Sequence, residues 1–253
     1  MAPTSAIRSS LTLLSLHLSL RSPAIKPSFL STLPRAPPFA ASPHRSRLNH
    51  NRSRTASMVV RAARVESKEV VLGSKAPRFQ LPEPLTGRTW ILRDFDESDV
   101  LLVMFICNHC PFVIHLKEDI VKLSNFYMKK GLSVVAISSN SVVTHPQDGP
   151  EYMAEEAKLF CYPFPYLYDE SQDVARDFGA LCTPEFFLFK KDEQKRFELV
   201  YHGQFDDSRP SNNLPITGKD LRQAIECALS GQPIPSDQKP SVGCSIKWHP
   251  LIK

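Results

Sequence analysis

The chain has 253 residues, six cysteines and a formal charge of +5. Residues 1–65 hold nine Arg and one Lys but no Asp or Glu, so residues 66–253 carry 21 basic and 26 acidic side chains. This acidic remainder, with its Lys and Arg scattered among acids, argues against nucleic-acid binding. No segment has the ~18 consecutive apolar residues of a membrane span.

The first 62 residues have the composition of an organelle transit peptide. Residues 1–65 contain twelve Ser and seven Pro, and such basic, Ser-rich, acid-poor segments are typical of imported precursors. We expect import into the chloroplast stroma, with the mitochondrion as the alternative, and no fold for residues 1–62. The apolar stretch 11–20 leaves a secretory signal as a further alternative.

The remaining ~190 residues are enough for one well-buried domain, which we expect at 66–232. Residues 233–253 show no periodicity and are expected to form a tail without regular structure. Apolar periodicity and turn residues predict, in chain order, a hairpin at 79–92 with its turn at Gly87, a buried strand at 99–106, a helix at 112–128, a buried strand at 132–138, a helix at 150–160, a short strand at 165–167, a helix at 171–178, a strand hairpin at 185–202 and a helix at 219–229.

Two cysteines lie where the first buried strand becomes a helix. Cys107-Asn108-His109-Cys110 follows the strand and precedes Pro111, a residue suited to the first helical turn. Thiols at this spacing can close a small disulfide ring, and the free backbone N–H groups of a helix start favour a thiolate on the first cysteine. The sequence therefore predicts a redox dithiol.

The order of strand, CxxC, helix, strand and a later X-Pro before a hairpin resembles the thioredoxin superfamily. The stretches 105–112 and 243–248 resemble its redoxin or peroxiredoxin-like (AhpC/TSA-type) branch, in the plant chloroplast form. The resemblance implies an α/β thioredoxin fold, with a central mixed β-sheet, helices on both faces and an N-terminal β-hairpin extension.

The resemblance also implies roles for individual residues. Cys107 would be the attacking thiolate and Cys110 the resolving thiol, with Thr183-Pro184 as the cis-proline loop that receives the substrate backbone. His109 would stabilise the thiolate relative to the disulfide, and its alternative is a solvated histidine of the loop. The implied protein is a thiol-disulfide oxidoreductase with an antioxidant or redox-homeostasis role. It would need no bound cofactor or metal, take electrons from the thioredoxin or glutathione system, and act on protein disulfides.

Three further residues are candidates for the site, each with a plain structural alternative. Cys182 is either a third thiol beside Cys107 or a small buried side chain. Glu185 is either the missing base for the second cysteine or an exposed carboxylate. Cys244 is either a packed anchor of the tail or a mobile redox partner. Cys161 and Cys227 occupy helical patterns and are expected in the core.

Some positions depart from the patterns of the superfamily. Ile106 stands where a Trp usually precedes the first cysteine, and Leu101 replaces the buried carboxylate that serves as a base. A peroxiredoxin has Thr and Pro three and seven residues before its peroxidatic cysteine, where this chain has Met104 and Val100. A thioredoxin-dependent peroxidase is therefore the second choice.

Two other classes of function stay open. One is a zinc site formed by Cys107, Cys110 and a histidine such as His115, although a structural zinc site normally shows a second close pair of ligands. The other is a redox-inactive adaptor with a thioredoxin fold. Stoichiometric zinc would indicate the first, and failure to reduce a model disulfide would indicate the second.

Cleavage of the transit peptide is predicted near Ala62, because Val60-Arg61-Ala62-Ala63 resembles a stromal processing site. N-terminal sequencing of the mature protein tests this prediction. A mature chain that begins before about Arg45 or after Glu66 would contradict it.

Overall fold

The computed structural model describes residues 64–68 and 70–250. The predicted transit peptide, residues 1–62, lies outside this part. None of the helices in the described residues is long and apolar enough to cross a membrane.

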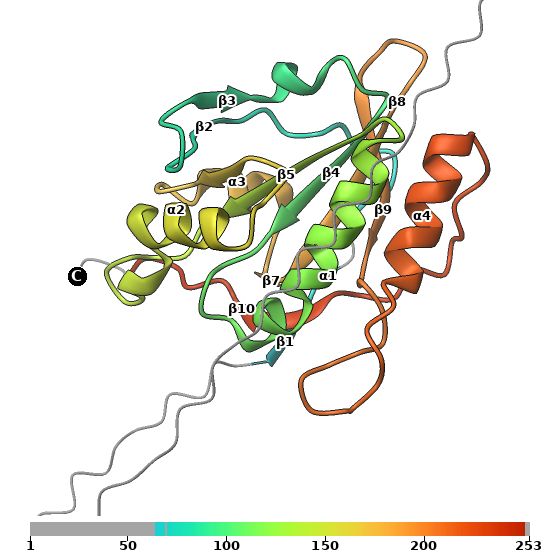
Figure 1. Ribbon diagram of the computed structural model, residues 1–253. Coiled ribbons are helices and arrows are strands. Elements are labelled where there is room, and N and C mark those ends of the chain that lie inside the picture. Colours follow the sequence, from blue (N-terminus) through green and yellow to red (C-terminus); the bar gives the residue numbers. More distant parts are fainter. Residues whose placement is uncertain (1–63, 69, 251–253) are drawn as a thin grey trace, which may run out of the picture. The chain divides into compact units, whose positions relative to one another are not determined.

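A five-stranded mixed sheet forms the centre of the fold (Figure 1). Its strands, in spatial order, are β6 (Tyr166–Tyr168), β5 (Leu132–Ser138), β4 (Val100–Phe105), β8 (Glu185–Lys191) and β9 (Phe197–Gly203). The strands β4, β5 and β6 are parallel, whereas β8 is antiparallel to β4 and to β9. The predicted parallel pair and the predicted later hairpin are both confirmed.

Strand β4 is buried on both faces, which explains its unbroken run of apolar residues. Because successive side chains of a strand point to opposite faces, Leu102 and Leu101 belong to different core clusters. Leu102 packs in the cluster of α1 (Pro111–Met128), and Leu101 packs in the cluster of α3 (Asp173–Phe178). Both leucines are completely buried.

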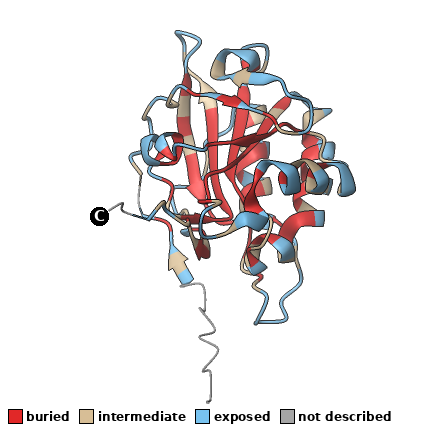
Figure 2. Ribbon diagram, turned by 90° about the vertical axis from the view of Figure 1, so that its left-hand side faces the viewer, coloured by how far each residue is buried: buried red, intermediate tan, exposed pale blue. Residues whose placement is uncertain are grey.

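Helices cover both faces of the sheet, as the resemblance implied. The elements α1, α2 (Pro150–Leu159) and α4 (Lys219–Ser230) contribute to one cluster. The other face is covered by α3 and by the N-terminal hairpin of β2 (Gln80–Pro82) and β3 (Thr89–Ile91). Figure 2 shows the buried residues concentrated on the strands and on the inward sides of the helices. Two short 3-10 helices, η1 (Leu92–Phe95) and η2 (Pro146–Asp148), complete the connections.

The C-terminal segment differs from the prediction. Residues 242–245 were expected to have no regular structure, but they form strand β10 (Val242–Ser245). This strand lies antiparallel between β1 (Arg64–Glu66) and β7 (Cys182–Thr183) in a separate small sheet. The strand exists because of pairing with segments distant in sequence, which leaves no periodic signal in four residues that include a glycine.

The expected burial of two cysteines is also corrected. Cys161 is exposed, because α2 ends at Leu159 and the chain turns at Cys161 with a φ of 50°. Cys227 is only half-buried on α4. A helical pattern of apolar residues that extends past the real end of a helix produces this kind of error.

Replacement of Leu102 by Ala tests the importance of the central strand. The change leaves a cavity in a fully buried position, so we expect the free energy of unfolding to fall by about 2–5 kcal/mol. Urea unfolding measures this change. The matched control is Leu159→Ala at a site where the side chain is 74% exposed, and equal losses in both variants would contradict the prediction.

Candidate active site

The two cysteines of the CxxC motif lie against the Thr183-Pro184 loop. Cys107 follows the end of β4, and Cys110 is the N-cap residue of α1. The sulfur of Cys107 is 3.4 Å from the hydroxyl of Thr183, and that of Cys110 is 3.1 Å from the carbonyl oxygen of the same residue. The Thr183–Pro184 peptide bond is cis. The fold thus brings together two pairs of residues that are more than 70 positions apart in sequence.

Both sulfurs are shielded from solvent. Cys107 is 1% exposed, Cys110 is 0% exposed and Thr183 is 2% exposed. A buried thiol can attack a disulfide of another protein only after the residues that cover it move. The attack requires both a thiolate and physical access to the sulfur. The structure therefore represents a closed form of the site.

Asp148, which sequence reasoning missed, holds the CxxC loop in place. One carboxylate oxygen accepts backbone N–H groups from Asn108 (2.9 Å) and His109 (3.2 Å). The other lies 2.5 Å from Nδ1 of His109 and accepts the side-chain amide of Asn140 at 2.9 Å. Burial alone would raise the pKa of Asp148, but the hydrogen bonds from His109 and Asn140 outweigh it and lower that pKa.

His109 connects this carboxylate to the first cysteine. Its Nδ1 is 3.9 Å from the sulfur of Cys107, and its ring stacks on that of His145 with 4.7 Å between centroids. The pKa of His145 is lowered, first by burial and then by the charges of His109 and Lys247. A cationic His109 would attract a thiolate on Cys107, whereas Asp148 repels it.

The two thiols have opposite pKa shifts. Burial raises the pKa of Cys107 well above its usual value, and the neighbouring Cys110 and the charge of Asp148 raise it further. The pKa of Cys110 is lowered by hydrogen bonds from the thiols of Cys107 and Cys244, against the effect of its own burial. Burial therefore disfavours a thiolate on Cys107 as long as it is shielded from solvent. The role of Cys107 as the attacking thiolate stays a prediction.

Glu185 points inward and stabilises the cis-proline loop. One oxygen accepts the backbone N–H groups of Leu181 (2.7 Å) and Cys182 (3.0 Å), and the other lies 2.8 Å from Nε2 of His202. Glu185 and His202 are both buried. The carboxylate oxygens are thus engaged by the loop and by the imidazole, and no hydrogen bond joins them to Cys110 among the described residues. Glu185 is a positioning residue in this arrangement.

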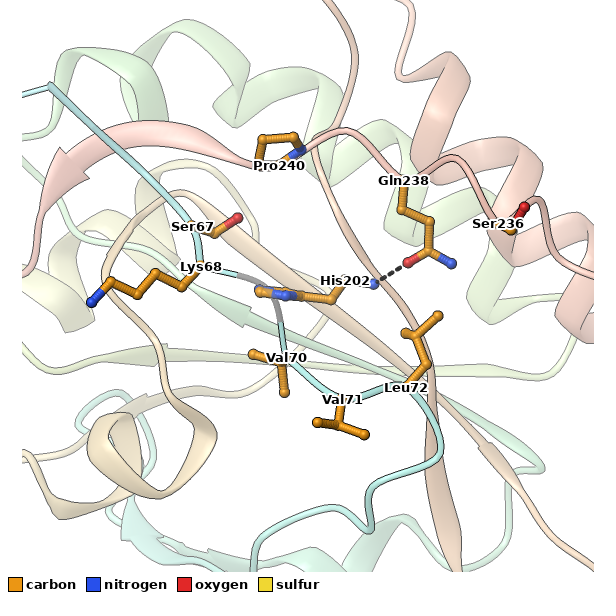
Figure 3. A pocket seen from close by; sticks show the side chains of 9 residues that line it. All are labelled: Ser67, Lys68, Val70, Val71, Leu72, His202, Ser236, Gln238 and Pro240. Atoms are coloured by element: carbon orange, nitrogen blue, oxygen red, sulfur yellow. Dashed lines mark hydrogen bonds between the residues drawn. The ribbon is translucent and has the colours of Figure 1, made fainter.

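His202 also borders a cavity of about 690 Å³ behind this loop. Its backbone N–H donates to the side-chain oxygen of Gln238 at 2.8 Å, and Figure 3 shows the ring between Val70 and the C-terminal segment at Pro240. The first residues of the described chain and its last segment meet here. The cavity does not include either cysteine of the CxxC motif.

Cys182 is completely buried beside the cis-proline. Its thiol donates weakly to the carbonyl oxygens of Pro184 and Ser241, each at 3.9 Å. Burial, and next the charge of Glu185, raise the pKa of Cys182. These contacts favour the small buried side chain over the third reactive thiol for this position.

One group of three side chains in the described part of the chain has the arrangement of metal ligands. It contains Cys107, His109 and Asp148, whose donor atoms all lie within 4.8 Å of one another. His115, which the sequence suggested as a zinc ligand, is not in this group. A metal here would have to replace the 2.5 Å contact between His109 and Asp148, so these donors are already used by each other.

A dithiol at the start of a helix, facing a cis-proline at the edge of a mixed sheet, defines a thioredoxin-fold protein. The chain matches the AhpC/TSA family over residues 72–196. Over these residues the chain is similar to that family.

Two solved structures are similar along most of the chain. An uncharacterized conserved protein from Geobacillus kaustophilus is 48% identical, with a TM-score of 0.72, and the match covers 75% of this chain and 98% of that one. A hypothetical protein from Sinorhizobium meliloti 1021 is 44% identical, with a TM-score of 0.70 and coverage of 73% and 98%. No curated protein matches the chain at a significant level.

Replacement of Asp148 by Asn tests whether this carboxylate holds the site. Its pKa is lower in the folded protein, so its contribution to stability is complete above the unfolded-state pKa of about 3.9 and is lost as the pH falls through the folded-state pKa. We expect the variant to lose about 1–3 kcal/mol of unfolding free energy at neutral pH. The difference from the wild type should shrink as the pH falls below about 4.

Urea unfolding as a function of pH measures this difference. Asp173→Asn is the matched control, because that side chain is 73% exposed and, among the described residues, forms an ion pair only with Arg176 at the surface. A pH-independent difference for Asp148→Asn would show that the charge of the carboxylate does not contribute.

Proposed function

We propose that the protein is a thiol-disulfide oxidoreductase in which Cys107 and Cys110 alternate between dithiol and disulfide. The observation that carries this proposal is the convergence of both sulfurs on Thr183, at 3.4 and 3.1 Å, next to a cis-proline. The match to the AhpC/TSA family over residues 72–196 supports the same class of chemistry.

The proposed reaction balances without a bound cofactor. Cys107, as a thiolate, attacks one sulfur of a protein disulfide and expels the other as a thiolate, which takes up a proton. Cys110 loses its proton and attacks the sulfur of Cys107, which releases the second partner thiol. Two electrons pass to the partner, and the Cys107–Cys110 disulfide remains. A dithiol of the thioredoxin system, or glutathione, then reduces it.

Exposure of Cys107 is part of this proposal. Burial is the largest cause of its raised pKa, so contact with solvent or with a partner's polar backbone would lower that pKa toward the ordinary thiol value of about 8.5. Attack by Cys107 therefore belongs to an opened form of the site. His109 would help there by its charge, and the cis-proline loop of Thr183 and Pro184 would bind the substrate backbone.

The place of action is proposed to be the chloroplast stroma, with the mitochondrion as the alternative. The basic, acid-free composition of residues 1–65 supports import. The redox-homeostasis role follows from the same proposal, because an imported dithiol protein would exchange with the thioredoxin or glutathione pool of that compartment.

The competing functions have less support. Met104 and Val100, at the positions where a peroxiredoxin needs Thr and Pro, are buried apolar residues of β4 and offer no side-chain polar group to a peroxide. A zinc site would need the donors that His109 and Asp148 use for each other. A redox-inactive adaptor would not need two thiols in contact with the same residue, Thr183, next to a cis-proline.

A redox titration of the full-length chain, with thiol trapping and mass spectrometry, tests the proposal. We expect a reversible Cys107–Cys110 disulfide with a potential between roughly −270 and −120 mV, and catalysis of insulin-disulfide reduction. Cys107→Ser and Cys110→Ser should each abolish this catalysis. Cys161→Ser is the matched control, because Cys161 is exposed and its thiol contacts the carbonyl oxygen of Lys158 rather than a residue of the site.

Three results would reject the proposal. Absence of the Cys107–Cys110 disulfide with zinc bound at one ion per chain would favour the metal site. Rapid peroxide consumption that depends on Cys107 alone would favour the peroxidase. A disulfide that forms without any reduction of insulin would favour the adaptor.

A further inference from the structure

The C-terminal strand β10 occupies the backbone edge next to the cis-proline. Cys244 is paired with Thr183 and Ser245 with Cys182, in antiparallel register. Figure 1 shows β10 beside β7, near the start of α1. An extended segment of a partner protein that used the loop before Pro184 would need this same edge. The chain's own C-terminal segment therefore fills the position that the proposed function assigns to a substrate.

The contact between β10 and the loop is unusually close. A Cβ atom on Gly243 would lie 2.0 Å from the carbonyl oxygen and 2.6 Å from the carbonyl carbon of Thr183. Only glycine permits this approach without a shift of the backbone. Both ends of the strand are also held: the Ser241 hydroxyl donates to a carbonyl of β9 at 2.8 Å, and the N–H of Lys247 donates to Asn140 at 2.8 Å.

Strand β10 places Cys244 in the buried cluster that contains Cys110, the second cysteine of the CxxC motif. Cys244 is 3% exposed and belongs to the same core cluster as Cys110, which is 0% exposed. Thr183 joins the two, because its backbone pairs with Cys244 and its carbonyl oxygen contacts the sulfur of Cys110. The interaction between the two thiols lowers the pKa of Cys110 and raises that of Cys244. Three buried cysteines thus meet at one residue.

We propose that Cys244 is a third redox cysteine of this site, and that it pairs with Cys110 in a disulfide that fastens β10 across the cis-proline loop. The step starts from the Cys107–Cys110 disulfide and is an isomerisation. Cys244, as a thiolate, attacks the sulfur of Cys110; the Cys110–Cys244 bond forms and the Cys107–Cys110 bond breaks. The electron pair goes to the sulfur of Cys107, which takes up the proton that Cys244 lost.

The isomerisation needs no oxidant or reductant, because the number of disulfides is unchanged. After the isomerisation the protein is still oxidised, and Cys107 is a free thiol. The Cys110–Cys244 bond then holds β10 over the edge of β7 that a substrate would use. Reduction of the Cys110–Cys244 bond returns the strand to hydrogen-bonded contact, from which it can leave the edge. This inference rests on the proposed function for the origin of the Cys107–Cys110 disulfide, but the pairing of Cys110 with Cys244 can be tested separately.

The test uses the full-length Cys107→Ser variant, oxidised with glutathione disulfide and mapped by mass spectrometry of a non-reduced digest. Cys244 or Cys110 attacks the glutathione disulfide and the other thiol resolves the adduct, with release of two glutathione molecules. We expect the Cys110–Cys244 disulfide as the main product. Further replacement of Gly243 by Ala should reduce its yield severalfold, because the added Cβ pushes β10 away from Thr183.

Two control variants sharpen this test. The pair Cys107→Ser with Cys161→Ser should keep the disulfide. The pair Cys107→Ser with Cys244→Ser should leave Cys110 without an internal partner and give only the glutathione adduct. A disulfide between Cys110 and Cys182, or glutathione adducts alone in the single variant, would overturn the inference.

The wild-type chain separates this inference from the proposed function. We expect the oxidised wild type to be a mixture, in which some molecules contain the Cys107–Cys110 disulfide and others contain the Cys110–Cys244 disulfide. If the first forms and the second does not, the isomerisation is rejected and the oxidoreductase proposal stands. If Cys107–Cys110 never forms while Cys110 pairs with Cys244 in the Cys107→Ser variant, the oxidoreductase proposal and the isomerisation are rejected, and the pairing of Cys110 with Cys244 stands.

Discussion

The contacts of Thr183 hold the site together. Its hydroxyl meets Cys107, its carbonyl oxygen meets Cys110, and its backbone pairs with Cys244 on the C-terminal strand. The carboxylate of Glu185 holds the loop from the other side through the N–H groups that precede Thr183. A shift of this one residue would therefore change the surroundings of three thiols at once.

Two buried carboxylates stabilise the site from opposite sides and have different effects on its chemistry. Asp148 orders the CxxC loop, but its charge disfavours a thiolate on Cys107. Glu185 orders the cis-proline loop through backbone donors and His202. Because both charges are hydrogen-bonded, their burial is compatible with a stable fold. In this structure the site is thus ordered, and Cys107 is shielded from solvent.

The elements with strong local signals were predicted well. The buried strand β4, the helix α1 and the strand β5 follow from apolar periodicity and from helix-end residues, because each buries a face that its own sequence pattern defines. The strand β10 and the exposure of Cys161 were not predicted. A four-residue strand owes its existence to its partners β1 and β7, and the end of α2 depends on how the following turn packs.

The sequence by itself determined the dithiol motif, because that motif depends on local spacing and on the chemistry of cysteine. Its resemblance to the thioredoxin superfamily implied the class of fold and the X-Pro that faces the motif. Only the tertiary structure decided which other groups surround the sulfurs. Asp148 and Cys244 lie far from the CxxC motif along the chain. No local pattern marks Asp148, and the sequence left Cys244 open as either an anchor of the tail or a redox partner. They reach the site because a loop after β5 and a strand from the C-terminal segment pack against it, and such long-range packing depends on the whole fold.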